Sequence, residues 1–186
     1  MSAWRGVAGI TLVELLVSLC VLSLVLAGVF SILHGAMSAY GWGAGRLEAQ
    51  QSARQALERM VTELREAGLD PTGAGVQPVS VAAPRLVTFQ RDLNGNGVID
   101  TTRERVTFLL RPGETVLRRD AGAGAQPIIN GVRRFALDYR DDAGAPTTDP
   151  SHVASVRIEL EVGLSGPTAV MQTEVSLRNR RTRALF

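Results

Sequence analysis

The sequence is poor in the residue types on which much enzyme and metal chemistry depends. Of its 186 residues, only one is cysteine and two are histidine. Cys20 alone excludes an intramolecular disulfide framework and any zinc site with several cysteines, while His34 and His152 leave little material for a histidine-based metal centre. Lysine is absent, so the 20 basic residues are all arginine, against 18 acidic residues. A net charge of +2 indicates no dense basic face, and binding to nucleic acid is not expected.

Catalytic motifs are lacking as well. Serine and acidic residues are common, but the chain has neither a Gly-x-Ser-x-Gly elbow nor a phosphate-binding glycine loop, since Gly122-Ala123-Gly124 lacks the third glycine and the strand-to-helix context. We therefore expect a protein that is not an enzyme and that requires no cofactor. The chain length suits one domain, or one domain with an appendage.

Apolar residues, in contrast, are concentrated near the start of the chain. The run 15–33 carries no charged side chain, and extending it back to Ile10 adds only Glu14. A helix of this length spans a hydrocarbon core of about 30 Å. The short leader 1–9 carries a single side-chain charge, Arg5, so the positive-inside rule keeps the N-terminus cytoplasmic and exports the rest.

Two ordinary explanations of this segment leave features unexplained. A cleaved signal peptide suits the basic start and the small residues at 36–38, but its apolar region is only about 7–15 residues long. It also does not account for Glu14. A plain membrane anchor explains the length but not this carboxylate, because an acidic residue within a span costs about 2.5–3.5 kcal/mol on insertion scales. The position of Glu14 therefore indicates a function.

The residues around Glu14 form a known pattern. Residues 9–16, GITLVELL, resemble the processing site of type IV prepilins and type II secretion pseudopilins, with Ile10 where phenylalanine is more usual. The resemblance implies that a prepilin peptidase in the bacterial inner membrane cuts between Gly9 and Ile10 and methylates the new amine. It also implies that Glu14 meets the N-terminal amine of a neighbouring subunit in an assembled fibre.

After the span, the pattern becomes that of an amphipathic helix. Apolar residues recur at helical spacing: Ala53, Leu57, Met60, Val61, Leu64 and Ala67. Gly68, followed by Asp70-Pro71, is a stop signal, so one helix from about Ile10 to Ala67 is predicted, with its second half docked by one face on a globular domain. Three glycines within 41–45 predict a bend or local melting at the membrane exit, unless they only allow close packing.

From Val79 onward the period changes to two. Apolar and polar residues alternate around 106–110, 135–139, 156–162 and 169–177, and turns rich in glycine and proline separate these segments. They predict half-buried strands of an antiparallel sheet with one face on the helix. The expected fold class is therefore α+β, which agrees with the pilin-like fold that the resemblance implies. The expected parts are a leader at 1–9, a transmembrane half-helix at 10–34, an amphipathic half-helix at 35–69 and a β-rich globular domain at 70–186.

One loop has the residue spacing of a metal site. Residues 92–100 correspond to the first three-quarters of an EF-type calcium loop, in which oxygen ligands alternate with other residues and a glycine makes the sharp turn. The candidate calcium ligands are Asp92, Asn94, Asn96, Val98 (through its carbonyl) and Asp100.

This loop departs from the calcium pattern at its end. The twelfth position, where a bidentate glutamate belongs, is Arg103, and Glu104 follows one residue too late. A weak site, with a Kd of about 10⁻⁴–10⁻³ M, is the most that the pattern predicts. The alternative is a plain turn between the strands around 87–89 and 106–108, because Asn and Gly tolerate positive φ.

These observations favour a structural subunit that resembles the PilW and J-type group of minor pilins and pseudopilins. The length, the lack of paired cysteines and the large strand region favour a minor over a major subunit. By the resemblance, its partners are other pilins or pseudopilins, in the tip or initiation complex of a type IV pilus or a type II secretion pseudopilus. The alternative is a single-pass membrane-anchored module that binds calcium or another ligand.

Overall fold

The computed structural model describes residues 9–163 and 168–179. The chain divides into two compact units, Met1–Ala44 and Gly45–Phe186. One helix, α1 (Leu12–Arg65), makes up nearly all of the described part of the first unit and continues into the second. Of the predicted leader, only Gly9 belongs to the described residues.

Helix α1 begins where the sequence carries a capping signal. The backbone N–H of Glu14 donates to Oγ1 of Thr11 at 3.2 Å, and the N–H of Leu15 donates to the carbonyl oxygen of Thr11 at 3.1 Å. Thr11 and Glu14 have the Thr-x-x-Glu spacing of a capping box. The helix continues without interruption through 41–45, so the prediction of local melting at those glycines is wrong.

After α1 ends at Arg65, the chain turns at Gly68. The φ of Gly68 is 76°, and a Cβ on this residue would lie 2.5 Å from the carbonyl oxygen of Asn179 and 2.7 Å from Cγ of Pro78. Its N–H donates to the carbonyl oxygen of Gln90 at 2.8 Å. The left-handed backbone and the close approach both require glycine. The turn after the helix is thus held against distant segments of the second unit.

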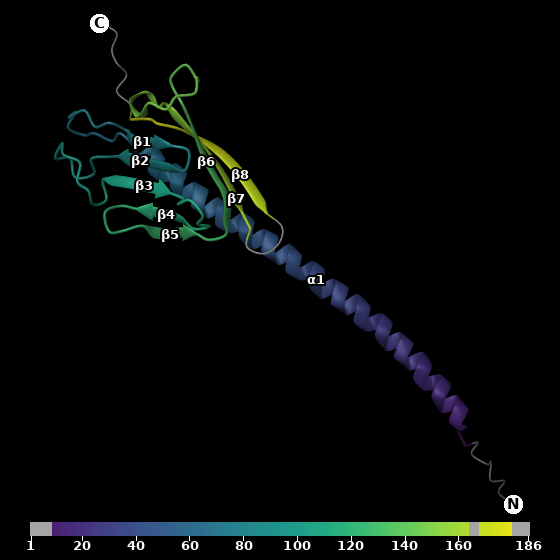
Figure 1. Ribbon diagram of the computed structural model, residues 1–186. Helices are drawn as coiled ribbons and strands as arrows, with labels where there is room; N and C mark the ends of the chain where they lie inside the picture. The colour runs from purple at the N-terminus through teal and green to yellow at the C-terminus, as the bar shows by residue number, and fades with distance from the viewer. Residues whose placement is uncertain (1–8, 164–167, 180–186) are drawn as a thin grey trace, which may run out of the picture. The chain divides into compact units, whose positions relative to one another are not determined.

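Within Gly45–Phe186, the strands form two antiparallel sheets (Figure 1). The five-stranded sheet has the order β1-β2-β3-β4-β5, with bounds Val79–Ala83, Leu86–Gln90, Arg105–Leu109, Leu117–Asp120 and Gln126–Ile129. The three-stranded sheet has the order β6-β7-β8, with bounds Val132–Arg140, Ser155–Val162 and Ala169–Ser176. A short 3-10 helix, η1 (Pro150–His152), precedes β7. The predicted α+β arrangement is confirmed, although the strands form two sheets instead of one.

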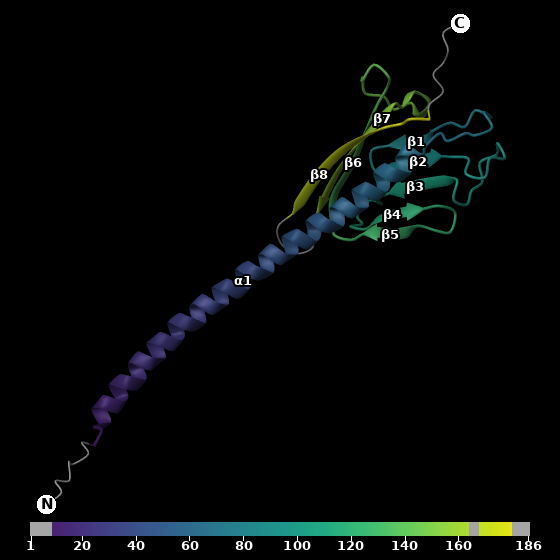
Figure 2. The ribbon, with the colours of Figure 1, turned by 180° about the vertical axis from the view of Figure 1, so that it is seen from behind.

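The two sheets and the C-terminal half of α1 share one hydrophobic core. Figure 2 shows this half of the helix passing across the five-stranded sheet. The largest fully buried side chains of this core come from the helix and from both sheets: Met60, Leu64, Phe89, Phe108, Leu117, Phe135, Ile158 and Leu160. The rings of Phe89 and Phe108 stack with their centroids 6.0 Å apart. The alternation predicted from the sequence is confirmed at Val106, which is buried like Phe108 on the same face of β3.

Polar side-chain contacts also connect these layers. Nε of Arg119 on β4 donates to both carboxylate oxygens of Glu63 on α1, at 2.9 and 2.8 Å. The hydroxyl of Tyr139 on β6 lies 2.9 Å from the carbonyl oxygen of Ala83 and 3.0 Å from that of Leu86, and burial raises its pKa. The first contact joins the helix to the five-stranded sheet, and the second joins the two sheets to each other.

Candidate functional site

The predicted cleavage site lies in a short non-helical segment before α1. Gly9, Ile10 and Thr11 are exposed and have no regular secondary structure, and 75% of the surface of Ile10 is accessible. Proteolysis is concentrated at accessible backbone outside regular elements. The peptide bond between Gly9 and Ile10 is therefore open to a peptidase in the isolated chain.

Glu14 lies in the first turn of α1, among apolar side chains. Its N–H takes part in the Thr11 cap, whereas its carboxylate forms no hydrogen bond or ion pair with any residue in 9–163 or 168–179. A negative charge in the first turn interacts favourably with the helix dipole. Within a membrane, the carboxylate would still need a partner, which this part of the chain does not provide.

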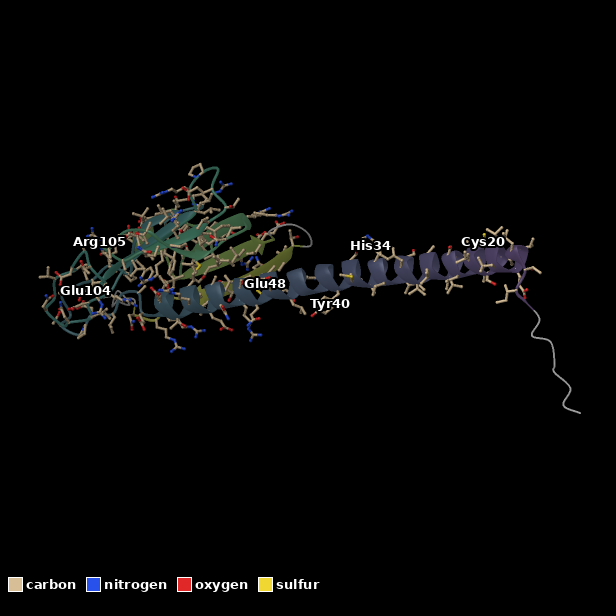
Figure 3. All side chains as sticks on the ribbon, turned by 90° about the horizontal axis from the view of Figure 1, so that it is seen from below. Cys20, His34, Tyr40, Glu48, Glu104 and Arg105 are labelled. Carbon is tan, nitrogen blue, oxygen red and sulfur yellow. The ribbon has the colours of Figure 1, made fainter. Side chains whose placement is uncertain are left out.

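Within 9–163 and 168–179, no residue covers the apolar half of α1. No residue in its most hydrophobic window is buried, and Figure 3 shows side chains projecting from the segment marked by Cys20 and His34. The core helix of a soluble protein would bury at least a stripe of such side chains. Among the described residues, α1 is the one helix that is long and apolar enough to cross a membrane. The described chain therefore carries the element that single-pass anchoring requires.

The connection between β2 and β3 is organised around Asp92. This side chain is fully buried (0% exposed), and its two carboxylate oxygens accept hydrogen bonds from the backbone N–H groups of Gly95 at 2.6 Å and Gly97 at 2.8 Å. The N–H of Asp92 donates to the carbonyl oxygen of Leu69 at 2.8 Å. Burial of a carboxylate is tolerated when hydrogen bonds compensate it, and here the amides of the loop itself do so.

Glu104 organises the other half of this loop, a role that the calcium pattern did not reveal. Oε1 accepts hydrogen bonds from the N–H groups of Leu93 at 3.0 Å and Asn94 at 3.1 Å, and Oε2 accepts one from Asp100 at 2.8 Å. These bonds, above all that from Asp100, lower the pKa of Glu104. Arg103 has a left-handed φ of 71°, so a glutamate one position too late for an EF-type loop still faces inward.

The other predicted calcium ligands form turns within the loop. Oδ1 of Asn94 accepts a hydrogen bond from the N–H of Asn96 at 2.9 Å, and Oδ1 of Asn96 accepts one from Val98 at 2.8 Å, as in consecutive Asx turns. Nδ2 of Asn94 donates to Oδ2 of Asp100 at 3.2 Å. The described residues contain no group of three or more His, Cys, Asp or Glu side chains placed to hold a metal ion. Calcium binding by this loop stays a prediction.

We expect millimolar calcium to raise the Tm of the full chain in detergent, because a ligand that binds only the native state stabilises it by mass action. Differential scanning calorimetry with and without calcium chloride measures the shift. Asp100→Asn, at an exposed candidate ligand, should abolish it, and Val98→Ala, which keeps the backbone carbonyl, should retain it. An unchanged Tm of the wild-type chain would leave the plain turn as the better account.

The sequence gives no sign of a buried arginine beside this loop. Arg91 is 8% exposed, forms an ion pair with Glu66 just after α1, and places Nη2 3.5 Å from the carbonyl oxygen of Arg103. Its guanidinium lies 6.0 Å from the ring centroid of Phe89, and its Nε has no hydrogen-bond partner among the described residues. The ion pair connects the end of the helix to the loop after β2.

A serine, a histidine and an aspartate also meet at η1. Oγ of Ser151 and Oδ2 of Asp149 both face Nδ1 of His152, at 3.2 and 2.8 Å. A catalytic triad needs the two partners on opposite ring nitrogens. Asp149 instead caps η1, and its hydrogen bonds from Ser151 and then His152 lower its pKa to about 2. The trio therefore stabilises a turn.

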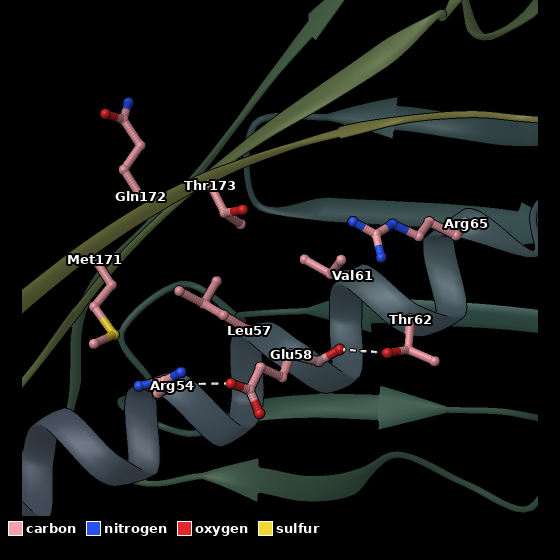
Figure 4. Close-up of a pocket in the computed structure, with 9 residues that line it drawn as sticks. All are labelled: Arg54, Leu57, Glu58, Val61, Thr62, Arg65, Met171, Gln172 and Thr173. Carbon is pink, nitrogen blue, oxygen red and sulfur yellow. Dashed lines mark hydrogen bonds and ion pairs between the residues drawn. The ribbon is translucent and has the colours of Figure 1, made fainter.

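A groove of about 670 Å³ lies between α1 and the edge strand β8 (Figure 4). Leu57 and Val61 line its helix side, and Met171 lines its strand side. Arg54 and Glu58 form an ion pair of 2.8 Å on the helix. The nine residues that line the groove include no nucleophile paired with a base, and the groove has no chemical feature that would define a ligand.

No protein-family model matches the chain, and no curated protein matches it significantly. Its function must therefore be inferred from its own residues and their geometry.

Proposed function

We propose that the chain is a minor pilin or pseudopilin, a structural subunit of a type IV pilus or of a type II secretion pseudopilus, and not an enzyme. One observation carries the proposal: the processing-like motif at 9–16 begins in exposed non-helical backbone at 9–11 and continues into the first turn of an apolar helix that no described residue covers. A substrate of a membrane-embedded peptidase needs the accessible bond and the membrane span in this order.

The chemistry of the first unit supports an assembly role. Its exposed apolar side chains need lipid, or other helices of the same kind, as a cover. The Glu14 carboxylate, which has no partner in 9–163 or 168–179, has an appropriate one in the N-terminal amine of a neighbouring subunit. In this proposal, lipid surrounds the helix before assembly and other pilins surround it afterwards.

The same proposal sets the location and partners of the protein. The helix half 10–34 spans the bacterial inner membrane once, and the C-terminal domain is periplasmic until the subunit enters the fibre. The partners are the prepilin peptidase and other pilins or pseudopilins. The rather long chain, its single cysteine and its large strand region support a minor subunit in the tip or initiation complex.

Mass spectrometry of the mature N-terminus tests this function. We expect the chain to start at a methylated Ile10, because cleavage after Gly9 exposes the amine that the peptidase methylates. Gly9→Leu should block processing by placing a bulky side chain beside the scissile bond, so that the leader stays attached. Gly6→Leu, a matched change within the leader, should leave processing unchanged.

Two results would contradict the proposal. An intact Met1 in the wild-type chain would support a plain membrane anchor. A start near Tyr40 would indicate removal of the whole apolar segment as a signal peptide.

A further inference from the structure

The loop between β2 and β3 contains two of the three Asn–Gly pairs of the chain, 94–95 and 96–97, and the third is 130–131. Asn–Gly is the dipeptide most prone to deamidation. The backbone nitrogen of the glycine attacks Cγ of the asparagine, the new N–Cγ bond closes a succinimide, and the side-chain nitrogen leaves as ammonia. Water then opens the ring to give aspartate or isoaspartate, so the reaction needs no enzyme and no oxidant.

The backbone N–H groups of Gly95 and Gly97, whose nitrogens would attack, both donate hydrogen bonds to the buried carboxylate of Asp92. The N–H of Gly95 donates to Oδ1 of Asp92 at 2.6 Å, and the N–H of Gly97 donates to Oδ2 at 2.8 Å. The side chains of Asn94 and Asn96 are exposed, so solvent reaches the carbons that would be attacked. One carboxylate therefore controls the nucleophile of two modification sites.

We propose that Asn94 and Asn96 are sites of spontaneous deamidation, and that Asp92 sets the rate at which they react. The attacking nitrogen must lose its proton, and an anionic nitrogen beside a buried carboxylate is strongly disfavoured because like charges repel in a low dielectric. The hydrogen bond to Asp92 must also break before the nitrogen can turn toward Cγ. Deamidation therefore proceeds only from states in which the loop has opened locally.

The modification would change the loop in two ways. Each event replaces a neutral amide by a carboxylate, so two events add two negative charges between Asp92 and Asp100. The isoaspartate product also adds a methylene group to the main chain, which breaks the Asx turns that Asn94 and Asn96 form with the following residues. A deamidated loop is thus more acidic and less ordered than the native one.

The third pair provides an internal comparison. Asn130 is exposed and Gly131 is buried, in the turn between β5 and β6. Both hydrogen bonds to the Asp92 carboxylate oxygens come from the loop, so the rate at Asn130 should not depend on Asp92. A substitution that acts through Asp92 changes the deamidation rate only at 94 and 96, whereas a substitution that unfolds the domain changes the rate at 94, 96 and 130.

The test uses the full chain in detergent at neutral pH, with deamidation at 94, 96 and 130 followed by peptide mapping. We expect the wild-type deamidation rates at 94 and 96 to be at least about tenfold lower than in the urea-unfolded chain. If the closed loop is more stable than the open loop by ~1.4 kcal/mol, the reactive open state is populated about tenfold less. Asp92→Asn should raise the rates at 94 and 96 several-fold and leave that at 130 unchanged. Glu104→Gln leaves in place the hydrogen bonds from the N–H groups of Gly95 and Gly97 to Asp92, so it should raise the rates at 94 and 96 less than Asp92→Asn does.

Two results would overturn the proposal. Rates at 94 and 96 as fast in the native as in the unfolded chain would show that the loop gives no protection. A rise in Asp92→Asn that is no larger at 94 and 96 than at 130 would assign the protection to folding in general. Hydrogen exchange on the wild-type chain decides independently of any variant: the Gly95 and Gly97 amides should be protected, and exchange at the unfolded rate would exclude the role of Asp92.

Discussion

Glu14→Ala is expected to leave cleavage after Gly9 intact and to remove the subunit from the fibre. The variant loses a carboxylate that is unfavourable in lipid, so membrane insertion should be as good as in wild type or better. In the fibre, however, the N-terminal amine of a neighbour would lose its partner in a low-dielectric environment. Breaking such a pair costs about 3–5 kcal/mol, which is enough to lower incorporation well over tenfold. Gel mobility measures processing, and co-purification with other pilins measures incorporation.

The cap at the start of α1 makes it possible to separate the charge of Glu14 from its local role. Glu14→Gln keeps the side-chain length and suits the third helical position of a capping box, but it removes the charge, so it should fail to assemble as Glu14→Ala does. Thr11→Ala removes the cap at a cost of about 1 kcal/mol and keeps the charge, so it should still assemble. Normal incorporation of Glu14→Gln would exclude the charge pairing.

Phe108→Ala is expected to lower the free energy of unfolding of the C-terminal domain by about 3–5 kcal/mol. The side chain lies on β3 and is fully buried, and its ring stacks on that of Phe89. Its removal loses the burial of the ring and leaves a cavity that the surrounding sheet and helix only partly close. Urea unfolding in detergent, followed by near-ultraviolet circular dichroism of the aromatic side chains, measures the loss.

The control for this core variant is Val98→Ala. Val98 is exposed on the loop after β2, and truncating such a side chain changes stability by no more than about 0.5 kcal/mol. A loss below about 1 kcal/mol for Phe108→Ala would place this residue outside the core that holds the sheets and the helix together.

The elements that the sequence predicts well are those with strong local signals. The predicted start of the helix near Ile10 lies close to the observed start at Leu12, where Oγ1 of Thr11 accepts a hydrogen bond from the N–H of Glu14. Gly68 predicts the turn after the helix, because the left-handed φ that such a turn requires is adopted readily by glycine. The buried positions of β3 follow from period-two alternation at Val106 and Phe108, which any half-buried strand shows.

Contacts that depend on tertiary structure could not be predicted in this way. Arg91 and Glu66 form an ion pair across a separation of 25 residues, and Arg119 and Glu63 do so across 56. In the sequence, each of these residues looks like an ordinary charged residue on the surface. The calcium pattern places Glu104 one residue too late for a ligand, and no local signal predicts the left-handed φ of Arg103 that lets Glu104 face into the loop.

The glycines at 41, 43 and 45 show how a local preference is overridden. Each weakens a helix by about 1 kcal/mol relative to alanine, which is why the sequence predicts a bend or local melting there. A break, however, would forfeit several consecutive hydrogen bonds and require the helix to nucleate again on the far side. Apolar sequence before the glycines and a docked face after them, with Ala53 and Met60 fully buried, favour continuation.

The close approach of Gly68 to Asn179 has a consequence for biosynthesis. The turn after the helix is completed by the residue that follows β8, and Val175 and Leu177 in the same segment belong to the shared core. A chain emerges with its N-terminus first, so Met60 and Leu64 remain without their full cover until the segment after β8 has been made. The domain closes late, through contacts between distant parts of the sequence, and such folds form slowly. Until then, the apolar face of the helix is the surface that a chaperone would have to shield.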